Sequence, residues 1–74
     1  MDRNEFLLLA MSHAMGNDAR VIYDGIEYYP ISLTITPQKN KTYLHSVMLQ
    51  DVKQHNSFIQ AKLDEVEKQQ GEKA

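Results

Sequence analysis

Histidines are the side chains of this sequence best suited to acid–base or metal chemistry, and there are three, His13, His45 and His55. Two histidines that share a metal usually form a close pair, such as positions i and i+4 on one helix face. Here successive histidines lie 32 and 10 residues apart, with no carboxylate in register with them. We therefore expect His13 on a helix face, His45 half-buried and His55 in a loop, with no metal site.

Nucleophile and phosphate-binding motifs are missing from the sequence. Its serines lack the Gly-x-Ser-x-Gly context of a nucleophile elbow. Three glycines are too few to build a phosphate-cradling loop. The absence of cysteine excludes disulfides and thiolate zinc sites. We predict a protein that is not an enzyme and that needs no cofactor.

The length and charge of the chain bound its class. Seventy-four residues make one domain, expected over residues 1–67, with a disordered tail at 68–74. A net charge of −2 argues against a protein built around phosphate neutralisation. The first residues are acidic where a signal peptide is basic, and the apolar run 6–11 is shorter than the roughly 20 residues of a membrane span. We expect a cytoplasmic protein with no membrane segment.

Residues 3–15 fit a helix that Asp2 caps, with Glu5 as its capping-box partner and Gly16 as the stop. Positions 6–11 are apolar all round the helix axis, which is wider than one core requires. We predict that part of this helix packs on a target protein or on a second copy, giving a homodimer when no partner is present. The alternative is that a curled sheet and residues 64–67 bury the leucines within one chain. The candidate self-association residues are Leu7, Leu8, Met11 and Met15.

From Ala19 onward the apolar period is two, which predicts an antiparallel sheet over residues 19–63. Asp24-Gly25 is a strong signal for a two-residue hairpin turn with both residues at positive φ. The apolar phase shifts near Pro30, which predicts a β-bulge there. Residues 42–50 are apolar on both faces, so this strand is expected inside the sheet.

Residues 57–67 fit two structures equally well. As a helix, Ser57 and Gln60 form a capping box and the helix propensity is high. As a strand followed by a short turn at residues 64–66, the segment supplies the cover that three strands alone do not give.

Three segments, Val21–Tyr28, His45–Asp51 and Asn56–Glu67, resemble a pattern in small, mostly uncharacterised proteins of Gram-positive phages and integrated elements. The resemblance covers about two-thirds of the chain. It implies an SH3-like small barrel whose last strand ends in a single tight turn, which favours strand at 57–63. The predicted fold is therefore α+β, an N-terminal helix followed by a curled antiparallel sheet of three or four strands. The alternative is αβββα with a C-terminal helix at 57–69.

Tyrosines and loop lysines are the candidates for recognition. Tyrosine joins a large apolar body to a polar tip and is enriched in interface hot spots. The residues singled out are Tyr23, Tyr28, Tyr29, Lys39, Lys41 and Tyr43. We predict a non-catalytic protein-interaction module, and the resemblance implies a phage or mobile-element accessory protein that modulates a host enzyme or defence complex. The alternative is a nucleic-acid accessory domain using the lysines and tyrosines, against which the low number of clustered cations counts.

Overall fold

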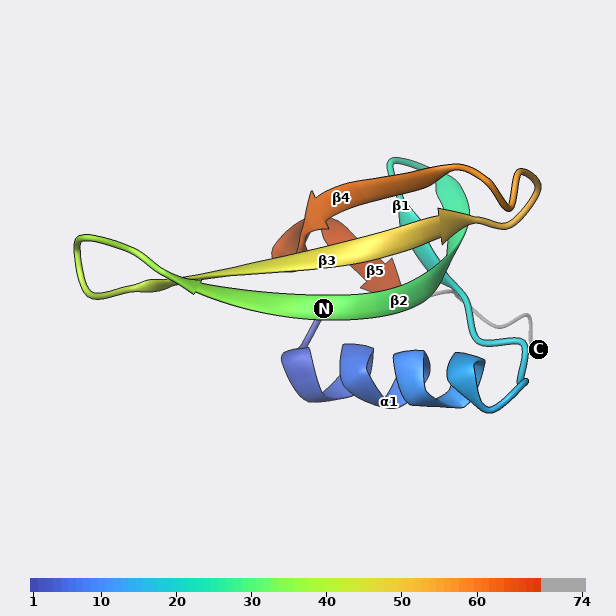
Figure 1. Ribbon diagram of the computed structural model, residues 1–74, viewed down its shortest axis with the longest axis horizontal. Coiled ribbons are helices and arrows are strands. Elements are labelled where there is room, and N and C mark those ends of the chain that lie inside the picture. The colour runs from blue at the N-terminus through green and yellow to red at the C-terminus, as the bar shows by residue number, and fades with distance from the viewer. Residues whose placement is uncertain (69–74) are drawn as a thin grey trace.

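The computed structural model describes residues 1–68 and shows one helix against a five-stranded antiparallel sheet, an α+β arrangement (Figure 1). In chain order the elements are α1 (Arg3–Ala14), β1 (Val21–Tyr23), β2 (Ile26–Pro37), β3 (Tyr43–Asp51), β4 (Phe58–Lys62), a 3₁₀ turn (Leu63–Glu65) and β5 (Val66–Lys68). The sheet has five strands rather than three or four because the short β5 pairs with β1. Of the predicted tail, Lys68 belongs to β5 and residues 69–74 lie outside the described residues.

Helix α1 occupies the predicted segment and ends close to the predicted stop. Asp2 precedes it with extended backbone, but its side chain makes no capping hydrogen bond, so the predicted capping box is wrong. The first turn is closed by the backbone instead, where the Phe6 N–H donates to the Asp2 carbonyl at 3.0 Å. At the other end Gly16 has φ +96°, and its N–H donates to the His13 carbonyl at 3.0 Å. Glycine permits this left-handed helix end without steric cost.

The predicted hairpin is confirmed. Asp24 and Gly25 have φ angles of 53° and 77°, as a two-residue turn between strands requires. The turn aligns Tyr23 with Ile26, so β1 and β2 begin their ladder directly beside it. The predicted bulge is also confirmed, because the β2–β3 register shifts between Pro30 and Ser32.

The ambiguous segment 57–67 folds as β4, the 3₁₀ turn and the start of β5. Strand β4 pairs with β3 from Gln50↔Phe58 to Ser46↔Lys62, so β3 lies inside the sheet as predicted. The alternative prediction of a C-terminal helix at 57–69 is wrong for residues 57–68, the part of that segment that the structure describes. Pairing with the open edge of β3 overrides the local helix propensity, because propensity is a weak preference compared with tertiary packing.

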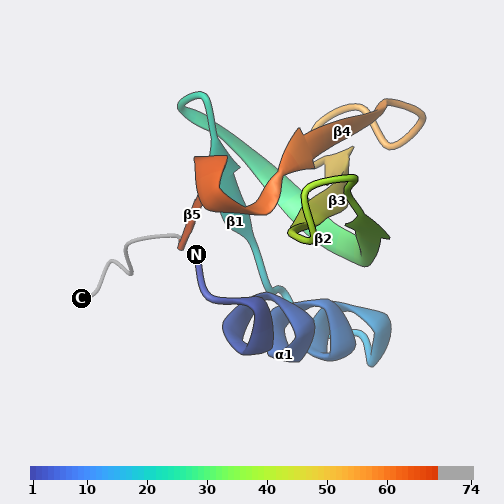
Figure 2. The ribbon, with the colours of Figure 1, turned by 90° about the vertical axis from the view of Figure 1, so that its left-hand side faces the viewer.

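The sheet is curled, with the strand order β4-β3-β2-β1-β5. The 3₁₀ turn carries the chain from one edge strand, β4, to the other, β5, and α1 lies beneath the curled sheet (Figure 2). Over residues 1–68, β4 and β5 do not pair, so the sheet is not closed by hydrogen bonds.

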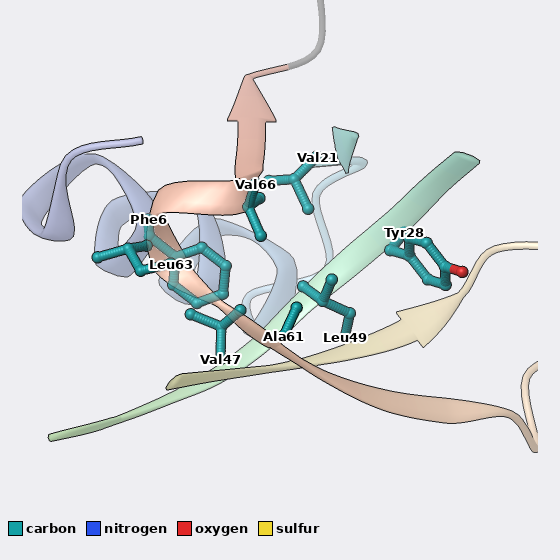
Figure 3. Close-up of a cluster of buried hydrophobic side chains, with 8 residues drawn as sticks. All are labelled: Phe6, Val21, Tyr28, Val47, Leu49, Ala61, Leu63 and Val66. Carbon is teal, nitrogen blue, oxygen red and sulfur yellow. The ribbon is translucent and has the colours of Figure 1, made fainter. Parts of the chain in front are cut away.

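The core fills the inside of this curl with side chains from every strand and from α1 (Figure 3). Phe6 is the buried residue of the helix and is completely covered. The buried cluster consists of Phe6, Val21, Tyr28, Val47, Leu49, Ala61, Leu63 and Val66. One core therefore joins the helix to all five strands.

Candidate interaction surfaces

Helix α1 leaves a large apolar surface in solvent. Phe6 is buried, and Leu9 and Ala10 pack partly against the core. On the other side of the helix lie the four residues predicted for self-association. Their exposed fractions are 40% for Leu7, 66% for Leu8, 59% for Met11 and 77% for Met15. We refer to these four residues as the apolar helix face. The sheet covers one side of an all-round apolar helix, as the sequence pattern predicted.

The apolar helix face is also free of charge. From Phe6 to Met15 the chain has no Asp, Glu, Lys or Arg. The ionisable side chain in this stretch, His13, is stacked on the Tyr29 ring of β2 at 4.5 Å between centroids and 13° between planes. A partner that covers the face therefore has no charged group to desolvate within it.

A second surface is a shallow cleft of about 570 Å³ between the C-terminal end of α1, β2 and the β3–β4 loop. The residues that line it include His13, Asp18, Arg20, Tyr29, Gln50 and His55. Tyr29 is at its centre: besides the His13 stack, the His55 ring lies 6.3 Å away and the Arg20 guanidinium carbon 5.8 Å away. The Gln50 amide donates to the His55 carbonyl at 2.8 Å and so ties the loop to β3.

Arg20 is held in this cleft by two carboxylates. Its Nε donates to Asp18 and its Nη1 to Glu27, each at 2.9 Å. These hydrogen bonds, with Asp18 the larger contributor, raise the pKa of Arg20 above its ordinary value. Within residues 1–68 no group of three or more His, Asp or Glu is placed to hold a metal ion. The cleft offers stacked rings and hydrogen-bonding groups.

The predicted recognition tyrosines do not share one surface. Tyr28 is in the core with 7% of its surface exposed, and burial, followed by the charges of Asp51 and Asp24, raises the pKa of its phenol. Tyr23 is half-buried and packs against Tyr28 with ring centroids 6.3 Å apart. Tyr29, the next residue along the chain, lines the cleft instead.

Lys39, Lys41 and Tyr43 lie together at the far end of the β2–β3 hairpin, which extends beyond the other strands (Figure 1). Tyr43 is 63% exposed, and Lys41 has a φ of 67° in the turn. The turn is defined by the Gln38 N–H, which donates to the Thr42 carbonyl at 2.8 Å. These three residues form one end of a protruding arm.

The cleft histidines were not predicted as neighbours. His13 and His55 are 42 positions apart in sequence, and they meet at Tyr29 because α1 and the β3–β4 loop both flank the bulged part of β2. The spacing of the two histidines along the chain does not indicate that they lie close together in the fold. The predicted half-buried state of His45 is observed.

No family model, curated protein or solved structure matches this chain in the comparisons with known proteins. Within residues 1–68, no helix has the length and hydropathy needed to cross a membrane.

Proposed function

We propose that this protein is a non-catalytic protein-interaction module that binds its partner through the apolar helix face. The exposure of four large apolar side chains on one side of α1 is the observation that carries the proposal. Complete burial of a Leu or Met side chain is worth about 1.5–3 kcal/mol. At the observed exposures, covering the whole face yields about 4–7 kcal/mol before the costs of association.

The geometry of the face suits a groove on another protein. Leu8, Met11 and Met15 are separated by three and four positions, the spacing by which a helix inserts anchors into an apolar groove. Two of these three anchors are methionines, whose flexible thioether chains adapt to irregular pockets. The partner is therefore a protein with an apolar, uncharged groove about two helical turns long.

The fold and the sequence resemblance extend this proposal. The strand order and the 3₁₀ turn between the two edge strands support an SH3-like small barrel. On the resemblance to proteins of Gram-positive phages and integrated elements, we assign the protein to accessory factors of such elements. In that role it acts in the host cytoplasm and modulates a host enzyme or defence complex.

The test is capture of a partner by the full chain from lysate of the encoding cell, compared between matched variants. Leu8→Ser/Met11→Ser makes the helix face polar without touching the buried Phe6. Ile26→Ser is the control, because Ile26 is also exposed and apolar but lies at the β1–β2 hairpin. All three proteins are first shown to melt at similar temperatures.

We expect proteins retained by the original chain and by Ile26→Ser to be lost with the double variant. Cross-linking of the retained protein then maps to α1. A partner that binds the double variant as well as it binds the original chain would contradict the proposal.

A further inference from the structure

The charges of this acidic protein are segregated along the chain. Residues 28–63, which span nearly all of β2 together with β3 and β4, contain four lysines and one acidic residue, a net charge of +3. The whole chain has −2, so the other 38 residues carry −5. Lys39 and Lys41 lie in the loop between β2 and β3, Lys53 lies in the loop between β3 and β4, and Lys62 ends β4, so the positive charge is carried by the two loops and the edge strand.

The acidic residue in this region, Asp51, stabilises a turn through its side-chain carboxylate. Its Oδ1 accepts the Lys53 N–H at 2.7 Å and the Gln54 N–H at 3.0 Å. Asp51 also pairs with Tyr28, whose ring is in the core, and so it is in register with the inner face of the sheet. The carboxylate lies on the other side of the sheet from Lys62, and at the opposite end of β3 from Lys39 and Lys41.

Strand register defines that opposite, outer face. Residues directly across an antiparallel ladder lie on the same side of the sheet. Val47, Leu49 and Ala61 point into the core, so the alternate positions of β3 and β4 point outward. In rows across β2, β3 and β4, the outer residues are Tyr29–Gln50–Phe58, Ser32–Met48–Gln60 and Thr34–Ser46–Lys62.

This outer face has the composition of a surface that binds a flexible polyanion. It carries hydroxyls, amides, one lysine and the exposed Phe58 ring. Two carboxylates lie near it: Glu65 borders Lys62 in a shallow groove, and Glu27, on the same side of β2 as Tyr29, is paired with Arg20. Phe58 is 52% exposed on the edge strand. Lys62 lies within the face, and Lys39 and Lys41 lie beyond its end at the tip of the β2–β3 hairpin.

We infer that the outer face of β2, β3 and β4 binds single-stranded nucleic acid. The lysines contact the phosphates and Phe58 offers a ring to an unpaired base, a combination that holds single strands without sequence preference. A duplex does not expose its base faces, and an acidic polypeptide does not stack, so the exposed ring favours a single strand. This site is separate from the apolar helix face and is independent of the protein-binding proposal.

The number of lysines that contact phosphates determines the affinity for single-stranded nucleic acid and its dependence on salt concentration. With three phosphate contacts, log K falls against log salt with a slope of about −2, so affinity drops roughly 20-fold between about 50 and 200 mM salt. We expect a Kd of about 10 μM at the lower salt concentration and of about 100 μM near 150 mM, which is the weak end of the range for nonspecific binding at physiological salt. At physiological salt the binding is correspondingly weak, consistent with the total charge of the chain.

The test is fluorescence anisotropy of the full chain with a labelled oligothymidylate of about 15 nucleotides. We expect Lys39→Ala/Lys41→Ala/Lys62→Ala to abolish the salt-dependent binding. Lys68→Ala is the matched control, because that lysine is exposed on β5 outside the face. Phe58→Ala should weaken binding at least fivefold with the salt slope unchanged. Ile26→Ala should leave the affinity unchanged.

Two results would overturn this inference. One is the absence of salt-dependent binding at about 50 mM salt, or a loss in the triple lysine variant no greater than in Lys68→Ala. The other is tighter, lysine-dependent binding of polyglutamate than of the oligonucleotide, which would assign the face to an acidic protein. Neither result bears on the helix-face variants, so the two proposals fail separately.

Discussion

Asp24 and Gly25 illustrate how single residues determine local structure in this fold. Both have left-handed backbone, which matches the twist of the hairpin they join. Pro30 acts in the same local way, since a residue without an N–H cannot continue a central ladder and marks the bulge. These features were predictable because each depends on one or two adjacent residues.

Gly25→Val tests this turn directly. An added Cβ at Gly25 meets no atom within 4 Å, so the cost is backbone strain at φ 77° rather than a clash. A β-branched residue in this region costs about 1–3 kcal/mol. We expect that loss in urea unfolding, with Asp24→Asn as a control that tolerates positive φ. Equal stability of the two variants would show that the turn conformation is wrong.

Adjacent tyrosines show where residue-level prediction fails. Tyr28 and Tyr29 have the same side chain, yet one is in the core and the other in the cleft. Alternation along a strand separates their faces, but it does not say which face is buried. That outcome depends on the position of the bulge and on α1, which supplies the His13 ring that covers Tyr29.

Tyr28 gives a prediction about pH. Burial raises the pKa of its phenol above the ordinary value of 10.0, so the folded protein keeps the proton where the unfolded chain loses it. The stability from this group is complete below about pH 10 and is lost as the pH rises through the raised pKa. We expect the urea midpoint to be lower at about pH 11 than at about pH 8, with the fall beginning near pH 10, and the fall to be smaller in Tyr28→Phe. Tyr43→Phe, at an exposed site, should keep the original decline; a similar flattening there would contradict the assignment to Tyr28.

Elements whose structure depends on distant partners were the hardest to predict. Residues 58–62 contain good helix formers, and only the unpaired edge of β3 makes them a strand. Strand β5 was not predicted because three residues carry too little pattern, and its pairing with β1 spans more than 40 positions. Helix α1 was predictable in both extent and exposed side, since its apolar run exceeds what one sheet covers.

Phe6 holds α1 to the sheet, and its replacement should show this. Phe6→Ala removes the completely buried side chain of the helix, a change that costs about 3–5 kcal/mol. In a domain of this size such a loss approaches the whole stability. Leu8→Ala on the exposed side should change stability by about 0.5 kcal/mol or less. Urea unfolding followed by circular dichroism compares the two, and equal losses would mean that α1 does not dock through Phe6.

At the scale of the whole molecule, two surfaces of different chemistry remain open. One is the uncharged apolar helix face, and the other is the outer face of β2, β3 and β4, with Lys62 within it and Lys39 and Lys41 at the hairpin tip beyond it. Sequence analysis predicted the first from helix periodicity. It gave nucleic-acid binding through loop lysines and tyrosines only as an alternative, because the strand register that places Phe58 and Lys62 on the outer side and Asp51 on the inner side cannot be read from the sequence. The net charge sums the charges of every face of the protein, whereas a binding partner contacts one face.

The apolar helix face also determines whether the protein associates with itself. Two copies that bury this face against each other gain roughly twice the 4–7 kcal/mol available to one, which is about 8–14 kcal/mol. The loss of translational and rotational freedom costs about 4–15 kcal/mol, so a net gain of roughly 6–7 kcal/mol remains when this cost lies in the lower half of its range. We therefore expect a weak homodimer that forms in the absence of a partner. Its face is uncharged, so the association should change little with salt.

Light scattering over a concentration series tests this expectation. The mass should rise from monomer toward dimer at about tens of micromolar, since a net gain of about 6–7 kcal/mol corresponds to a dissociation constant of about tens of micromolar. Leu8→Glu places a charge in the middle of the face and should restore the monomer, because the carboxylate cannot be desolvated there without a partner. Ile26→Glu carries the same charge at an exposed apolar site on the hairpin and should leave the dimer intact. If the original chain has a monomer mass at every concentration and Leu8→Glu behaves identically, α1 does not self-associate and the face belongs to a different partner.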